Sequence, residues 1–283
     1  MLDRVLGVAS VASLVIGAVV GSPAPPSTVD FTFTDPAIVE SSGLVALPGG
    51  LFVTVNDSGD SGRVFVVDGS GDTVGVTSWA ADPTDIEALA PAGPGAVWVG
   101  DTGDNTGSRS SVSVFRVPVG RGDRTVTPTA YSLVYPDGPQ DAETLLADPR
   151  TGRLLIVSKG IFGGTVYAAP TTLSADHDNV LKAVADSIPV ATDGSFYPDG
   201  RHYVVRNYTQ ADVYTFPGHE QVDSFPLPAQ RQGEGLAIAP DGSMHVSTEG
   251  QFSAVRRVRA PVVQSSLLAT FVAPLTWLLT RAW

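Results

Sequence analysis

GEGLAIAPDGSMHVSTE, residues 233–249, is the stretch that decides the fold of this chain. It combines a short apolar strand, a Pro-Asp-Gly turn and a second strand that ends in polar residues. Four other segments open in the same way: ESSGLVAL (40–47), DIEALAP (85–91), DAETLLA (141–147) and DGSFYPDG (193–200). Their apolar residues align at intervals of roughly 40 to 56 residues, which is typical of a propeller or another repeat array.

Each opening is followed by further short runs rich in Val, Phe and Tyr, which favour strands over helices. The second strands are LFVTVND (51–57), VWVGD (97–101), LIVSK (155–159), YVVRN (203–207) and HVSTE (245–249). The third are RVFVVD (63–68), SVFRV (113–117), TVYAA (165–169), DVYTF (212–216) and AVRRV (254–258). Fourth strands are expected at 73–80, 129–135, 186–190 and 221–226.

The fifth repeat has no fourth strand of its own, because Ala260-Pro261 begins a different kind of sequence. VDFTFT (29–34) precedes the first repeat and has the alternation of a strand. We therefore predict an all-β propeller of five four-stranded blades, in which this N-terminal strand closes the ring and removes an exposed edge. Six blades are the alternative, with the extra blade inside the long segments 118–140 or 171–190.

Composition limits the classes of function. The 283 residues include 30 Gly and 22 Pro, which suits many tight turns between buried strands. The formal net charge of −12 argues against a nucleic-acid partner, which needs a basic face. With no Cys, the chain has no disulfide, no thiolate metal site and no cysteine nucleophile.

The two ends differ from the repeats. Residues 1–22 have a basic start, an apolar stretch and small residues, as a signal peptide does, so we expect a secreted or cell-surface protein. Residues 23–28 are a Pro-rich linker, and 29–260 form the propeller domain. The apolar tail, 261–283, leaves three alternatives open: a helix packed on the propeller, a weakly membrane-associated segment, or disorder.

Acidic residues recur in two columns at the openings. Two positions before the aligned apolar residue stand Ser42, Glu87, Glu143, Gly194 and Glu234; four positions before it stand Glu40, Asp85, Asp141, Thr192 and Gln232. Residues two apart on a strand share a face, and the first strands of a propeller line its channel. Six carboxylates on one axis repel each other unless protons or a cation neutralise them. Oxygen ligands alone favour Ca²⁺ over Mg²⁺, so the metal-site candidates are Glu87, Glu143, Glu234, Glu40, Asp85 and Asp141. The alternative is that these acids are solvated or cap backbone amides.

The second strands end at the same face in a polar group that we take as candidate ligand-binding residues: Asp57, Asp101, Lys159, Arg206, Asn207 and Glu249. The basic members could hold an anion beside a cation, or pair with neighbouring acids. The loops NDSGDSGR (56–63) and GDTGDNTGSR (100–109) are similar to the first half of a calcium loop but lack its distal Glu. Tight-turn use of Asp and Gly explains them equally.

The phrases ESSGL, GEGLAIAPDG, VGDTGDN and YPDGPQDAETLLADPRTGRL resemble secreted bacterial β-propellers of the phytase-like (esterase-like), SdiA-regulated and gluconolactonase-like group. The resemblance covers most of residues 29–260. It implies a divalent cation, often calcium, in the channel, held here by Glu87, Glu143 and Glu234. Gly194 and Ser42 depart from the pattern, and the basic phosphate ligands of propeller phytases are incomplete.

Two functions follow as hypotheses. The first is an exported, calcium-associated binding or scaffold module with its ligand, a small molecule or an extracellular protein, at the acidic channel mouth. The second is a metal-dependent hydrolase of phosphate esters, lactones or esters, in which the cation polarises the substrate and activates water. A monomer is expected in either case.

Overall fold

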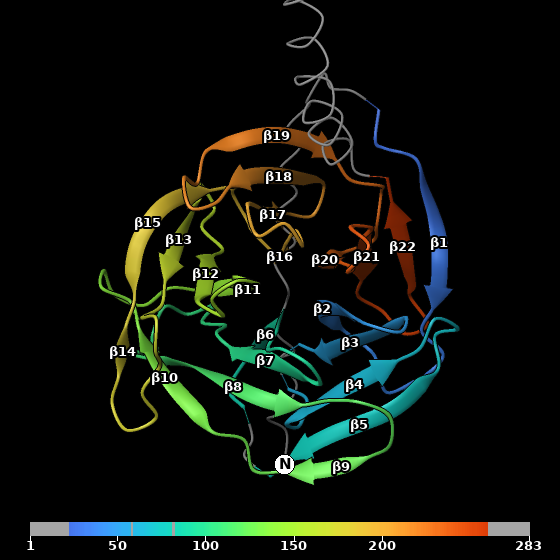
Figure 1. Ribbon diagram of the computed structural model, residues 1–283, viewed down its shortest axis with the longest axis horizontal. Coiled ribbons are helices and arrows are strands. Elements are labelled where there is room, and N and C mark those ends of the chain that lie inside the picture. Colours follow the sequence, from blue (N-terminus) through green and yellow to red (C-terminus); the bar gives the residue numbers. More distant parts are fainter. Residues whose placement is uncertain (1–22, 58, 81–82, 260–283) are drawn as a thin grey trace, which may run out of the picture.

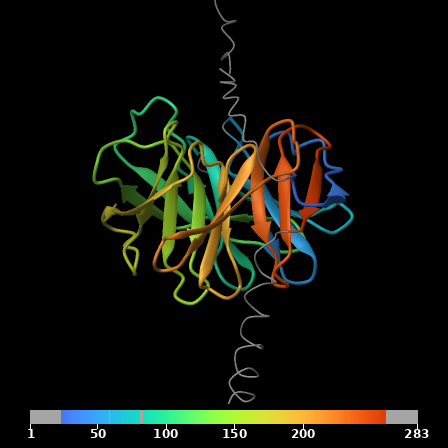
Figure 2. The same cartoon turned by 90° about the horizontal axis from the view of Figure 1, so that it is seen from above.

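The computed structural model describes residues 23–57, 59–80 and 83–259, which form a ring of five β-sheets around a central axis (Figure 1). Figure 2 shows the ring edge-on, with the strands running between its two faces. The described residues contain no α-helix, and so none that could cross a membrane. The expected signal peptide and C-terminal tail lie outside the described residues. The fold is a five-bladed β-propeller, as the repeats predict.

In each blade, four antiparallel strands lie side by side in order from the axis to the rim. Blade 1 consists of β2 (Ser41–Leu47), β3 (Leu51–Asn56), β4 (Arg63–Val67) and β5 (Thr73–Trp79). Blade 2 consists of β6 (Ile86–Pro91), β7 (Ala96–Asp101), β8 (Val112–Pro118) and β10 (Ala130–Val134). Blade 3 consists of β11 (Ala142–Ala147), β12 (Leu154–Ser158), β13 (Gly164–Ala168) and β15 (Lys182–Ser187). Blade 4 consists of β16 (Asp193–Phe196), β17 (His202–Arg206), β18 (Gln210–Thr215) and β19 (Gln221–Pro226). The fourth strand of blade 3 comes earlier in the chain than the expected 186–190.

Blade 5 is closed by the N-terminal strand, as predicted. It consists of β20 (Gly233–Ile238), β21 (Met244–Thr248), β22 (Ala254–Val258) and β1 (Ser27–Thr32). β1 lies antiparallel to β22 and pairs from Ser27↔Val258 to Thr32↔Ala254. The two ends of the described chain therefore meet in one sheet, and the ring has no open first or last blade.

The long segments that could have held a sixth blade add edge strands instead. β9 (Arg124–Val126) lies in the chain between β8 and β10 of blade 2 but pairs in parallel with β5 of blade 1. β14 (Asn179–Val180) lies in the chain between β13 and β15 of blade 3 but pairs in parallel with β10 of blade 2. Each insertion thus reaches back to the preceding blade and covers part of its outer edge. The six-bladed alternative is wrong.

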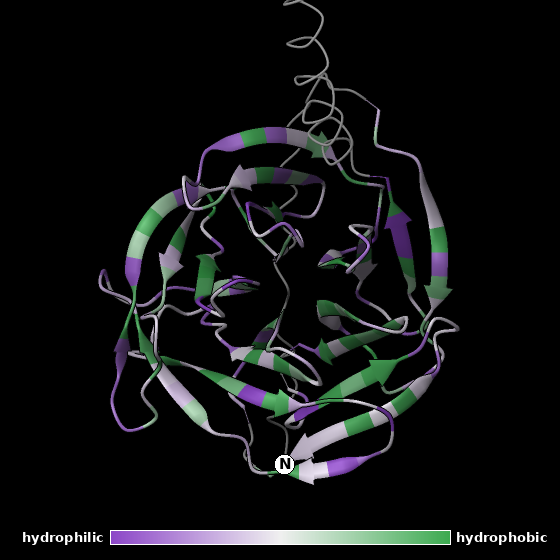
Figure 3. Ribbon diagram, viewed as in Figure 1, coloured by the Kyte–Doolittle hydropathy of each residue, from purple (hydrophilic) through white to green (hydrophobic). Residues whose placement is uncertain are grey.

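The hydrophobic core consists of five clusters, each between two neighbouring blades. Inner strands are buried on both faces: every residue of β11 and β12 is buried. Outer strands alternate apolar and polar residues, as Figure 3 shows along the rim. Sheets that pack face to face in this way bury one face of each blade against the next. The ring is thereby held by inter-blade packing as well as by the closing strand.

Blade 4 differs from the others at its innermost strand. In blades 1, 2, 3 and 5 a β-bulge interrupts the pairing of the first two strands, at Ser41/Leu44, Ile86/Ala88, Ala142/Thr144 and Gly233/Leu236. In blade 4 the pairing runs without a shift from Asp193↔Arg206 to Phe196↔Tyr203. Blade 4 therefore lacks the bulge residue that carries the acid in blades 2, 3 and 5, and the inner column has Gly194 there instead.

Asp193 is completely buried and reaches neighbouring blades. Its Oδ2 accepts hydrogen bonds from the backbone N–H of Leu236 in blade 5 (2.7 Å) and of Leu44 in blade 1 (3.2 Å). Its Oδ1 accepts one from Gly194 N–H (2.7 Å). Burial raises the pKa of Asp193, whereas the three N–H donors and the charge of Arg206 lower it. One carboxylate therefore joins the inner strands of three blades.

We predict that Asp193→Ala lowers the free energy of unfolding by about 3 kcal/mol or more, because it leaves buried N–H groups without an acceptor. Chemical denaturation measures the change. Asp186→Ala, an exposed position on β15, is the matched control and is expected to stay within about 0.5 kcal/mol of wild type. Equal stability of the two variants would contradict the role given to Asp193.

Candidate metal centre at the channel mouth

The glutamates of the inner column sit in the β-bulges. Glu87 and Glu143 are the residues between the paired positions of β6 and β11, and Glu234 lies in the corresponding irregularity of β20. A bulge turns a side chain away from the regular alternation of a strand. All three bulges lie near the start of an inner strand, at one end of the channel, which we call the mouth. The chain thus places three buried glutamates, from blades 2, 3 and 5, at this mouth.

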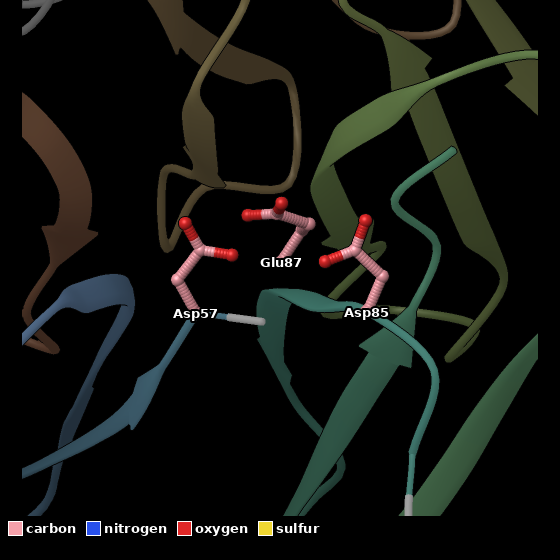
Figure 4. Close-up of side chains that lie close together, drawn as sticks. All are labelled: Asp57, Asp85 and Glu87. Atoms are coloured by element: carbon pink, nitrogen blue, oxygen red, sulfur yellow. The ribbon is translucent and has the colours of Figure 1, made fainter. Parts of the chain in front are cut away.

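Three carboxylates meet there across two blades (Figure 4). Asp57 follows β3 of blade 1, whereas Asp85 and Glu87 belong to the opening of blade 2. One oxygen of each lies within 4.8 Å of those of the other two. Ligand oxygens about 2.4 Å from a common Ca²⁺ lie at most about 4.8 Å apart, so this spacing fits one ion.

Neighbouring residues hold this trio in place. Ser42 Oγ donates to Glu87 Oε2 (3.1 Å) and to the Glu87 carbonyl (3.0 Å). The backbone N–H of Asp57 donates to the Glu40 carbonyl (3.0 Å). Gly103 lies against the trio, because a Cβ there would collide with the Asp85 carboxylate and lie 2.9 Å from Glu87 Cγ. The site therefore depends on Ser42, which stands in the inner column without being an acid, and on Gly103, which belongs to neither column.

Burial and like charges oppose ionisation of these acids. Burial raises the pKa of Glu87 well above its usual value, and the charges of Glu143, Asp57 and Asp85 raise it further. Burial, with Asp57 and Asp141, raises the pKa of Asp85 to about 6, although Arg109 opposes the shift. Glu87 is only 3% exposed. A cation bound here would supply the positive charge that the ionised carboxylates require.

Glu143 and Glu234 do not belong to the trio and are each 4% exposed. Glu143 Oε1 pairs with Lys159 Nζ, and Gln232 Nε2 donates to Glu234 Oε1 (3.4 Å). Burial raises the pKa of both carboxyls, and Lys159 opposes the shift in both. Lys159 has a raised pKa because the neighbouring acids, Glu143 first, outweigh its burial.

Among the described residues, three oxygens of the predicted metal ligands are buried and accept no hydrogen bond: Asp85 Oδ1, Glu143 Oε2 and Glu234 Oε2. A buried acceptor without a donor costs free energy. This argues against the alternative that these acids merely cap backbone amides. The donor set, oxygens only, fits a hard cation.

The outer column is less buried. Glu40 is exposed, and its pKa is raised by burial of part of the carboxyl and by Asp57 and Asp60. Asp141 is half-buried and accepts a hydrogen bond from the N–H of Asp104 (2.8 Å). Burial raises its pKa. These two residues border the mouth.

The predicted ligand-binding residues occupy different environments. Asp101 accepts hydrogen bonds from the N–H groups of Thr84 (3.0 Å) and Asp85 (2.9 Å) and pairs with Arg109 Nη1 (2.8 Å), so it positions the segment directly before β6 that carries Asp85. Asn207 Oδ1 accepts from the N–H groups of Thr209 (3.0 Å) and Gln210 (2.9 Å) and thereby shapes a turn.

Arg206 is completely buried and donates to the carbonyls of Asn207 (3.0 Å) and Gly235 (3.1 Å) and to Gln230 Oε1 (3.1 Å). Burial lowers its pKa to about 10. Glu249 faces the mouth, where burial and the charges of Glu234, Asp57 and Glu40 raise its pKa to about 7. Gln232 Nε2 donates to Glu249 Oε1 (2.6 Å).

No model of a known protein family matches the sequence, and no curated protein matches it either. Solved structures are similar to the chain at low identity. A candidate 6-phosphogluconolactonase from Bacteroides uniformis is 14% identical over 79% of this chain and 68% of its own, with a TM-score of 0.43. A streptogramin B lyase is 10% identical over 83% of this chain and 98% of its own, with a TM-score of 0.46. A glucose dehydrogenase is 12% identical over 78% of this chain and 83% of its own, with a TM-score of 0.44. At these values the comparisons carry no conclusion about the site, and the particular propeller group stays a prediction from sequence.

The raised pKa values predict an unusual pH dependence for the metal-free protein. A carboxyl whose pKa rises on folding binds more protons in the folded state, so stability falls as the pH increases from the unfolded to the folded pKa. For Asp85 and Glu249 this interval ends at about 6 and about 7. We expect the melting temperature in chelator to fall between about pH 5 and pH 7.5.

Glu249→Gln removes one of these groups and should flatten that slope, because its side chain no longer has to lose a proton in the folded state. Thermal melts at several pH values measure the effect. Glu220→Gln, which changes an exposed acid, is the control and should keep the wild-type slope. Parallel pH profiles for wild type and Glu249→Gln would contradict the electrostatic account.

Proposed function

We propose that this propeller is a divalent-cation-dependent binding module, with calcium as the preferred ion and the ligand at the channel mouth. Asp57, Asp85 and Glu87 would hold the ion, with Glu40 and Asp141 at the border of the site. The partner would be a small molecule or an extracellular protein that supplies further oxygen ligands to the ion. A bound calcium ion keeps coordination positions for such ligands, because it takes six to eight oxygens.

One observation carries the proposal: three carboxylate oxygens from two blades lie within 4.8 Å of one another in a partly buried site. Such an arrangement is electrostatically unfavourable without a counter-charge. The buried Asp85 Oδ1, which accepts no hydrogen bond from the described residues, gives independent support. The oxygen-only donor set favours a hard ion, and calcium tolerates an irregular geometry better than magnesium does.

Export is part of the proposal, on the signal-like sequence of residues 1–22. The oxidising state of the compartment has no consequence for a chain without Cys. Millimolar calcium outside cells would suit a site of modest affinity, of the kind that extracellular modules use.

We predict that calcium at about 100 times its Kd raises the melting temperature by about 5 to 10 °C, and that excess chelator reverses the rise. Asp85→Asn should abolish the calcium effect. In chelator it should melt above wild type, because it removes one of the mutually repelling carboxylates. Differential scanning fluorimetry measures both, with Asp186→Asn as control. An unchanged wild-type melting temperature and no metal by elemental analysis would exclude the metal site.

A metal-dependent hydrolase of phosphate esters, lactones or esters is the second candidate. Glu234 favours it, because this residue presents a buried oxygen with no hydrogen-bond partner among the described residues and has a raised pKa. A carboxylate in that state is suited to accept a proton from water. A bound cation would supply electrophilic activation of the substrate, and Glu143, held by Lys159, would border the same space.

A panel of phosphate ester, lactone and carboxylic ester substrates, with and without calcium, separates the two candidates. The hydrolase predicts calcium-dependent turnover that falls at least about 100-fold in Glu234→Gln and in Glu143→Gln, as expected for loss of a proton acceptor or a positioning carboxylate. The binding module predicts calcium-dependent stabilisation with no turnover. Asp186→Asn again serves as the matched control.

A further inference from the structure

The acids at the mouth fall into two groups. The first group is the trio of Asp57, Asp85 and Glu87, from blades 1 and 2. The second group consists of Glu143 and Glu234, from blades 3 and 5. Glu143 and Glu234 both interact electrostatically with Lys159, and Glu234 also with Arg206, although the charge of Glu143 reaches Glu87 of the first group as well. The second group therefore already faces a cation that belongs to the protein.

Lys159 occupies in blade 3 the position that Asp57 occupies in blade 1. Asp57 follows the Ser41↔Asn56 pair and donates its N–H to the Glu40 carbonyl (3.0 Å). Lys159 follows the Ala142↔Ser158 pair and donates its N–H to the Asp141 carbonyl (2.8 Å). Corresponding positions thus supply an acid to one group and an ammonium to the other.

The ammonium is held in place. Lys159 Nζ pairs with Glu143 Oε1 and lies 5.6 Å from the centre of the Tyr208 ring, within the range of a cation–π contact. The Lys159 side chain is 19% exposed. An ammonium fixed in this way repels a divalent ion from the same space.

The second group has unused capacity for ligation. Glu143 Oε2 and Glu234 Oε2 are buried and accept no hydrogen bond from any described residue. Each belongs to a residue that is only 4% exposed, so bulk water satisfies neither well. With Glu143 Oε1, these atoms would offer three oxygens to a hard cation if the ammonium were absent.

We propose that Lys159 substitutes for a second divalent ion, so that the wild-type chain takes one calcium ion, at the first group, and loss of the ammonium opens a second calcium site at Glu143 and Glu234. This inference rests on the proposed function, because it requires the first group to bind calcium. It makes Lys159 the residue that sets the number of ions.

Equilibrium dialysis of the full chain against calcium chloride tests the inference. We expect one bound ion per chain for wild type and two for Lys159→Met. Lys182→Met is the matched control, because it changes the chain's other lysine, which is exposed on β15, and it should bind one ion. Circular dichroism checks the folding of each variant.

Two more variants locate the second ion. Lys159→Arg keeps the positive charge and should bind one ion. Lys159→Met combined with Glu143→Gln should return to one ion, because a second-group ligand is lost. Should Lys159→Met not fold, Lys159→Gln takes its place with the same expectation, since its amide can still donate to Glu143.

The outcomes separate the two proposals. One ion in both wild type and the uncharged Lys159 variant overturns this inference and leaves the proposed function intact. No ion in wild type overturns the proposed function and this inference with it. A second ion that persists after Glu143→Gln also overturns the inference, because it lies elsewhere.

Discussion

The arrangement of the inner strands depends on the hydrogen bonds that the buried carboxylate of Asp193 accepts. It accepts backbone hydrogen bonds from blades 4, 5 and 1, and it does so from the one inner strand that has no bulge. In a low-dielectric interior such a carboxylate is stable only with its donors in place. The positions of three inner strands are thereby coupled, and with them the mouth that these strands help to form.

The acids at the mouth have different partners from one blade to the next. Glu87 is turned towards Asp57 and Asp85, whereas Glu143 is paired with Lys159. Repeated blades supply a carboxylate at similar positions. Its local partners decide whether it stabilises the fold, forms an internal ion pair or is available to a ligand. The unfavourable charge at the first group is the kind of local cost that proteins tolerate where a ligand offsets it.

The repeat phrases were sufficient to predict the propeller, its five blades and the closing strand, because strand alternation and turn residues recur in register. They also identified Asp85 and Glu87 as acids of the mouth. They did not group Asp57 with these two, since sequence columns compare positions within blades and this contact crosses from blade 1 to blade 2. A contact between blades depends on the twist and spacing of sheets, which no single repeat encodes.

The role of Asp193 was missed for a different reason. Aligning Phe196 with the leucines of the other openings hides the absence of one bulge residue, and so Asp193 fell between the acid columns. The sequence signal for this role is that Asp193-Gly194-Ser195 leads directly into Phe196 and leaves no extra residue for a bulge. The edge strands β9 and β14 were missed because two- and three-residue strands carry too little alternation to be recognised.

The pairing of Ser27 with Val258 makes the described chain almost a closed loop. Arg259 N–H also donates to the Pro26 carbonyl (3.1 Å), so the two ends lie within one hydrogen bond of each other. They lie beside Met244, at the end of blade 5 away from Thr248 and Gly233, and hence on the face opposite the mouth. A short linker could therefore join them, and the chain could be reopened between β1 and β2. In such a circular permutant all four strands of blade 5 would be consecutive, and the ring would be held shut by side-chain packing alone.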